Sequence, residues 1–113
     1  MITKVHRLLR IHKFEEIFRE GKRAMTPFFV VYIRENGLSI SRFSIVVSLK
    51  ISKKAVERNR IKRRIRAFLH TTIPTIKKGS DVIIRVNSSV VALLPYRDVE
   101  RELIQVLKKA QLI

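Results

Sequence analysis

The stretch that decides the fold is a basic segment at residues 52–69, which reads SKKAVERNRIKRRIRAFL. At about 100° per residue on a helical wheel, its apolar residues gather on one side and its basic residues on the others. We therefore predict a helix from Lys53 to Leu69, with Ser52 as its N-cap. The side that packs on the core is predicted to consist of Ala55, Ile61, Ile65, Phe68 and Leu69.

The other sides of this helix carry positive charge. Residues 48–66 contain nine basic residues and one acid, Glu57, so the segment contributes half of the net charge of the chain. Because solvated helix faces usually mix both signs, we interpret this surface as one that binds a polyanion. The residues opposite the apolar side are Lys53, Arg60, Arg63 and Arg64, and those that border it are Arg58, Lys62 and Arg66.

The composition of the whole chain also indicates a partner of negative charge. Among 113 residues, 25 Lys and Arg stand against 9 Asp and Glu, which gives a formal net charge of +16. This charge favours nucleic acid over a membrane surface, because the sequence has no amphipathic tail or lipidation motif. A hydrophobic fraction of 46% is enough for a core, and the length fits a single nucleic-acid-binding domain over residues 1–113.

The sequence lacks three features, and their absence excludes further classes of protein. The chain has no Cys, which excludes a disulfide framework, a thiol nucleophile and a Cys-based metal site. The longest apolar run, residues 28–33, has six residues, whereas a membrane span needs about 20. No stretch near the N-terminus resembles a secretory signal. We therefore expect a cytoplasmic protein with no membrane partner.

The segments on either side of the basic helix alternate between helical and extended patterns. In chain order, we predict a helix over His12–Glu20, strands over Phe28–Ile33 and Arg42–Leu49, the basic helix, a strand over Asp81–Val86 and a helix over Arg97–Ala110. A short strand near Arg23–Met25 would extend the sheet, and residues 87–95 fit either strand or helix. This order predicts an α+β fold with helices packed on a small sheet.

Candidate catalytic residues are missing from the pattern. A protein nuclease that uses two metal ions needs clustered carboxylates, but the only aspartates, Asp81 and Asp98, lie far apart in the sequence. His6, His12 and His70 have no metal-ligand spacing. We therefore predict no catalytic and no metal-ligating residue, and a protein that binds rather than cleaves.

The basic helix also resembles a known family. Residues 55–66, with Arg58-Asn59-Arg60, closely resemble the Arg-Asn-Arg helix of the bacterial ribonuclease P protein subunit. The resemblance extends to residues 14–18 followed by Gly21, to residues 42–50 and 81–85, and to the C-terminal helix. The chain departs from the family pattern at Ser44, where Gly is usual, at Leu49, where Lys is usual, and at His70, where Arg is frequent.

The resemblance implies a two-layer α/β sandwich with a small mixed sheet and a left-handed β-α-β crossover, similar to a domain of a ribosomal protein. It implies a ribonucleoprotein that removes the 5′ leader from precursor tRNA, in which the RNA subunit carries the chemistry. The implied partners are the ribonuclease P RNA subunit and precursor tRNA, with no obligate protein partner. The implied cofactor is Mg²⁺, held mainly by the RNA subunit and the substrate, and no organic cofactor is expected.

The resemblance also assigns roles to residues. The signature helix implies contact with the RNA subunit through Lys53, Lys54, Arg58, Asn59, Arg60, Lys62, Arg63, Arg64 and Arg66. A cleft between the first helix and the sheet is implied to hold the single-stranded leader, where aromatic rings stack on bases of any sequence. The candidates there are Phe14, Phe18, Tyr32, Arg42 and Lys50, with Tyr32 favoured because its ring has a polar tip.

Three other interpretations remain open at this point. A ribosomal or ribosome-assembly protein would share the charge and the fold class but would have no role in tRNA cleavage. A DNA-binding module is disfavoured because a strand, not a helix, precedes the basic helix, and no leucine-zipper heptads follow it. A stand-alone protein nuclease is disfavoured by the missing carboxylate cluster.

Overall fold

The computed structural model describes residues 6–7 and 14–113, and within them it confirms an α+β fold. The predicted helix residues His12 and Lys13 lie outside the described residues. The elements in chain order are α1 (Phe14–Glu20), β1 (Lys22–Met25), β2 (Phe29–Glu35), β3 (Arg42–Val46), α2 (Ala55–Thr72), the 3-10 turn η3 (Ile73–Thr75), β4 (Ser80–Val86), the 3-10 turn η4 (Ser89–Leu93) and α3 (Tyr96–Lys109).

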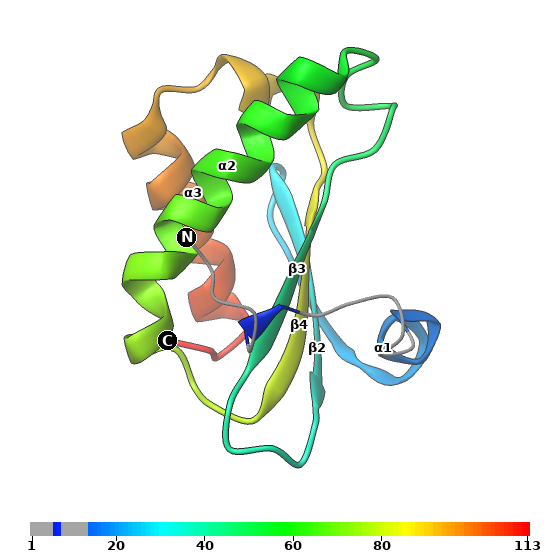
Figure 1. Cartoon of the computed structure of the whole chain (residues 1–113), viewed down its shortest axis with the longest axis vertical. Helices are drawn as coiled ribbons and strands as arrows, with labels where there is room; N and C mark the ends of the chain where they lie inside the picture. The colour runs from blue at the N-terminus through cyan, green and yellow to red at the C-terminus, as the bar shows by residue number, and fades with distance from the viewer. Residues whose placement is uncertain (1–5, 8–13) are drawn as a thin grey trace.

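The sheet has four strands in the order β1-β2-β4-β3. β2 pairs antiparallel with β1 and with β4, whereas β3 and β4 are parallel neighbours joined through α2. The β3–α2–β4 unit is thus the crossover that the resemblance implies, and its left-handed sense stays a prediction. Helices α2 and α3 cover one face of the sheet, and α1 lies on the other (Figure 1).

The main core lies between the sheet and the pair α2 and α3. The helical periodicity predicted the buried residues of α2 well, because Ile61, Ile65, Phe68 and Leu69 are all buried. α3 contributes Val99, Leu103, Val106 and Leu107. Ala55, predicted on the apolar side, is exposed because it is the first residue of the helix and lies beyond the sheet.

Several predicted boundaries are wrong by a few residues. α2 begins at Ala55 and its N-cap is Lys54, not Ser52, whose hydroxyl accepts a hydrogen bond from the Lys54 N–H at 3.1 Å instead. β3 ends at Val46 rather than Leu49, because the chain turns at Ser48, whose carbonyl accepts from the Ile51 N–H at 3.0 Å. The expected short strand is present as β1, and the ambiguous residues 87–95 contain η4.

A smaller apolar cluster lies on the opposite face of the sheet, under α1. Strand alternation places Val30 and Tyr32 of β2 there, together with Ile83 of β4 and Ile17 of α1. The same alternation places Phe29 and Val31 in the main core on the other face. Phe28 departs from that pattern because it precedes the strand and packs against the main core.

Within the described residues, no helix combines the length and the apolar character that a bilayer crossing requires.

Candidate nucleic-acid interface

Three aromatic side chains that the sequence singled out come together on the α1 face. The ring of Phe18 meets the ring of Tyr32 edge-on, with centroids 4.7 Å apart. Phe14 meets Phe18 in the same manner at 6.5 Å. The side chain that the sequence favoured, Tyr32, is only 7% exposed, whereas Phe18 is 39% exposed. The ring open to a ligand is therefore that of Phe18, and Tyr32 forms the floor beneath it.

Arg85 joins this cluster, although no sequence pattern pointed to it. Its guanidinium carbon lies 5.5 Å from the centroid of the Tyr32 ring, within the range of a cation–π contact. Arg85 is on β4, which pairs directly with β2, so strand pairing brings the cation beside the ring. A search restricted to runs of basic residues misses it, because its neighbours in the sequence are apolar.

A cavity of about 390 Å³ continues this surface toward the start of α2. Arg85 and the predicted residue Lys50 both line it, together with Ser48 and Asn87. Positive charge therefore lies beside the Tyr32 ring and continues along this cavity. We call the set Phe14, Phe18, Tyr32, Lys50 and Arg85 the aromatic–basic surface.

Arg42 belongs to the same predicted set but has a different environment. Its Nε and Nη2 atoms donate to the two carboxylate oxygens of Asp81, each at 2.8 Å. Asn36 donates a further hydrogen bond to Asp81 at 2.9 Å. The parallel pairing of β3 with β4 places Arg42 opposite Asp81. This guanidinium is thus held by a buried carboxylate at the far end of β4 from Arg85.

The basic helix α2 displays most of its predicted residues, but three arginines are also bound within the protein. Arg60 donates to the carbonyl of Ala92 at 3.1 Å, and Arg64 donates to that of Leu94 at 2.9 Å. Arg58 donates to the carbonyl of Ser52 at 2.9 Å. Lys53, Lys54, Asn59, Arg60 and Arg63 are exposed, and Arg58, Lys62, Arg64 and Arg66 are half-buried.

These contacts give Arg60 and Arg64 a structural task beside their charge. Both residues hold the η4 turn against α2, which the sequence could not show because η4 follows some 30 residues later. Their positive charge remains on the surface, so the helix still presents a basic face. A substitution at either residue would alter the turn as well as the charge.

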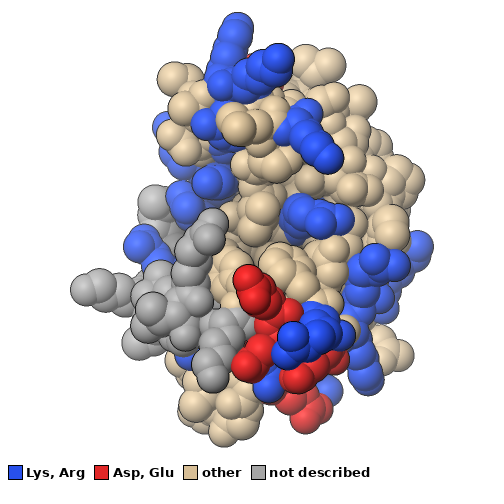
Figure 2. Space-filling view, turned by 90° about the vertical axis from the view of Figure 1, so that its right-hand side faces the viewer, with Lys and Arg blue, Asp and Glu red and all other residues tan. Residues whose placement is uncertain are grey.

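The two candidate surfaces lie on opposite sides of the sheet. α2 covers one face and the aromatic–basic surface lies on the other, next to α1 (Figure 1). Seen from the α1 side, lysines and arginines spread over much of the molecule, while the visible acidic side chains gather at one end (Figure 2). The protein can therefore contact one polyanion through α2 and a second polyanion on the opposite face of the sheet.

Carboxylates and histidines form no metal site in the part of the chain that the structure describes. No group of three or more His, Asp or Glu residues there could hold a metal ion. Nδ1 of His6 forms a hydrogen bond with the carbonyl oxygen of Ser41 at 2.9 Å, and His70 is exposed on α2. His12 lies outside the described residues.

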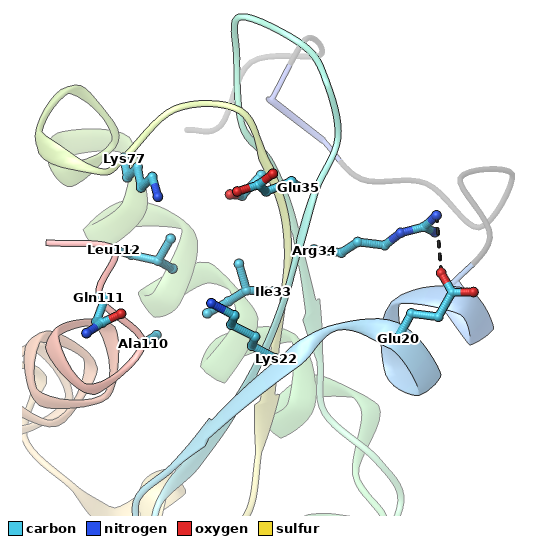
Figure 3. A pocket seen from close by; sticks show the side chains of 10 residues that line it. Glu20, Lys22, Ile33, Arg34, Glu35, Lys77, Ala110, Gln111 and Leu112 are labelled. Atoms are coloured by element: carbon cyan, nitrogen blue, oxygen red, sulfur yellow. Dashed lines mark ion pairs between the residues drawn. The ribbon is translucent and has the colours of Figure 1, made fainter.

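A second cavity, of about 210 Å³, lies near the ends of β1 and β2, beside the C-terminal residues. It is lined by both signs of charge, including Lys22, Lys77 and Glu35, and it contains no residue that the sequence predicted for binding (Figure 3). Because both signs of charge line this cavity, its charge does not favour the binding of a polyanion.

Comparison with known proteins decides the family. The family model described as Ribonuclease P matches residues 2–111 of the chain.

This chain belongs to the ribonuclease P protein family.

Curated relatives in this family carry the name ribonuclease P protein component. The relative from Syntrophus aciditrophicus is 34% identical over 102 residues, covering 90% of this chain and 84% of the relative. The relative from Thermotoga maritima is 40% identical over 82 residues, covering 73% and 69%. The chain is therefore a protein component of ribonuclease P and takes part in tRNA processing.

Solved ribonuclease P proteins share the fold. The T. maritima protein superposes with a TM-score of 0.82 at 33% identity, covering 90% of this chain and 94% of that one. A Staphylococcus aureus ribonuclease P protein, a mutant described as defective in mRNA degradation, gives a TM-score of 0.89 at 29% identity, covering 97% and 92%. The α+β fold with a small mixed sheet, which the resemblance implied, is thus confirmed.

Proposed function

We propose that this chain binds the ribonuclease P RNA subunit through α2 and the 5′ leader of precursor tRNA through the aromatic–basic surface. In this proposal the protein promotes endonucleolytic removal of the leader, which yields the mature tRNA 5′ end. The observation that carries it is the contact of the exposed Phe18 ring with Tyr32, itself beside Arg85, on the face of the sheet opposite α2.

The chemistry of the aromatic–basic surface suits a single strand of any sequence. An exposed ring can stack on any base, and nearby cations can pair with the phosphates on either side of that base. Phe18 supplies the ring. The charges come from Arg85, which lies over the Tyr32 ring, and from Lys50, which lines a cavity with Arg85. No base-specific hydrogen bond is needed, which fits leaders whose sequences differ.

The chemistry of α2 suits a folded RNA partner. Its cations lie along one rigid helix of 18 residues, so they can meet phosphates at a fixed spacing. The RNA subunit is proposed to perform the hydrolysis with Mg²⁺, which would stabilise the charge that develops on the phosphodiester. We place the Mg²⁺ ions with the RNA subunit and the substrate, since the described residues offer no donor cluster. The role of this chain is to bind and orient the leader.

A cleavage assay at low Mg²⁺ tests the proposal directly. Precursor tRNA is incubated with the RNA subunit of the same organism, with this protein, and with both. We expect correct 5′ cleavage to be strongly stimulated only when both are present. Tight RNA binding without stimulation would instead support a ribosomal or ribosome-assembly role. Cleavage by the protein alone would overturn the assignment of the chemistry to the RNA.

Replacing Phe18 with alanine should weaken the binding of precursor tRNA to the holoenzyme by about 5- to 100-fold, because one base loses its stacking partner. Binding of mature tRNA, which lacks the leader, should not change. Tyr96 is a matched control, since its exposed fraction of 38% is close to the 39% of Phe18 and it lies on α3. An equal loss in Phe18→Ala and Tyr96→Ala would remove Phe18 from the leader contact.

A further inference from the structure

The exposed ring of Phe18 belongs to a helix that is too short to be stable alone. α1 has seven residues, whereas isolated helices below about 12–15 residues are marginal in water. Its only buried residue is Ile17, which packs on Val30, Tyr32 and Ile83. The orientation of Phe18 toward Tyr32 therefore depends on whatever else fastens α1 to the sheet.

Gly21 fastens the end of α1. Its N–H donates to the carbonyl of Ile17 at 2.9 Å. A Cβ atom at this position would lie 2.5 Å from the Ile17 carbonyl oxygen and 2.7 Å from that of Ile33, so the helix end lies directly against the backbone of β2. This contact fixes where α1 ends, but an attachment at one end does not by itself fix the rotation of the helix about that end.

Arg34 supplies the second attachment. It lies two residues after Tyr32 on β2 and therefore on the same face of the sheet. Its Nη1 atom is 2.8 Å from a carboxylate oxygen of Glu16, and its Nη2 atom is 3.3 Å from one of Glu20. The hydrogen bond to Glu16 is the main reason why the pKa of Arg34 is raised above its usual value. Figure 3 shows Arg34 reaching from β2 to Glu20 on α1.

The two carboxylates are one helical turn apart, so a single planar guanidinium spans the turn that contains Phe18. An isolated ion pair at the surface contributes little to stability, but two carboxylates on one guanidinium form a network with defined geometry. The network restricts the rotation that Gly21 leaves open. The position of Phe18 over Tyr32 follows from these attachments together.

We propose that Arg34 is a positioning residue for leader binding: by pairing with Glu16 and Glu20, it holds α1 in the orientation in which Phe18 stands exposed beside Tyr32. The proposal rests on the leader-binding function proposed above and adds to it a residue that acts on the leader only through α1.

The decisive variant is Glu16→Gln with Glu20→Gln. For this variant, the change in charge and the loss of positioning predict opposite changes in the affinity for precursor tRNA. The variant removes two negative charges near a polyanion site, so simple electrostatics predicts tighter binding of precursor tRNA. Loss of the network predicts weaker binding, by roughly 3- to 10-fold. The affinity for the RNA subunit should stay within about twofold, since α2 lies on the other face of the sheet.

A matched control changes the same charge without touching the network. Glu15 on α1 and Glu35 at the end of β2 are exposed acids outside the ion pairs of Arg34. Glu15→Gln with Glu35→Gln should leave precursor tRNA binding unchanged or slightly tighter. Arg34→Glu should bind the precursor more weakly, and adding Glu16→Arg should restore the affinity to within about threefold.

The outcomes separate the two proposals. If the wild-type holoenzyme binds precursor tRNA no better than mature tRNA, the leader-binding function fails, and the role of Arg34 fails with it. If the wild type gains affinity from the leader and Glu16→Gln with Glu20→Gln keeps or increases that gain, leader binding stands and the positioning role of Arg34 is wrong.

Discussion

Replacing Asp81 with alanine should destabilise the fold by about 3–5 kcal/mol, a large share of the roughly 5–15 kcal/mol available to a domain. The carboxylate is buried and accepts hydrogen bonds from Arg42 and from Asn36, so its removal leaves a guanidinium without its counter-charge. Urea denaturation followed by circular dichroism measures the change in the free energy of unfolding.

The matched control replaces both partners of this pair with leucine. Because a buried ion pair exchanged for apolar residues is often neutral, Arg42→Leu with Asp81→Leu should cost far less than Asp81→Ala. If Asp81→Ala lowers the free energy of unfolding by less than about 1 kcal/mol, the Arg42–Asp81 pair does not stabilise the fold. In that case Arg42 returns to its predicted role at the leader, where Arg42→Gln would weaken precursor tRNA binding without loss of stability.

Replacing Lys62, Arg63 and Arg66 with glutamine should weaken binding to the RNA subunit by roughly 100-fold or more at low salt. The slope of log K against log salt should become shallower by about two to three, close to one unit for each phosphate that no longer meets a cation. The side chains of these residues form no hydrogen bond or ion pair within the described part of the chain. They are therefore cleaner probes than Arg60 and Arg64, which also hold η4.

The control for this experiment removes three charges elsewhere. Lys78, Arg97 and Lys108 are exposed and lie outside α2. Their glutamine variant should keep most of the affinity and of the salt slope. If both triple variants lose affinity equally, the RNA subunit responds to net charge alone, and α2 is not a specific contact surface. Filter binding of the labelled RNA subunit at four or five salt concentrations measures both the affinity and the slope.

The sequence predicted those parts of the molecule that depend on neighbours in the chain. The 3.6-residue period of α2 identified its buried face, and the composition of the β-branched and apolar runs located β2 and β4. These patterns arise because each element must bury one side, whatever it packs against.

Contacts between distant residues could not be predicted in the same way. Arg42 and Asp81 are 39 residues apart, and their pairing follows from the register of two parallel strands, which no local pattern encodes. The same holds for Arg85 beside Tyr32 and for Arg34 beside α1. The structure therefore adds Arg85 and Arg34 to the candidate site, and it shows that Arg42 is paired with the carboxylate of Asp81.

The position of β4 has a consequence for how the chain folds during synthesis. β4 lies between β2 and β3 in the sheet although it follows both in the chain. Until the ribosome has released residue 86, β1 and β2 can form a hairpin, but β3 has no neighbour in the described residues except a single bridge to Arg7. The two proposed RNA-binding surfaces therefore mature together and late, once the last strand has paired with both earlier ones.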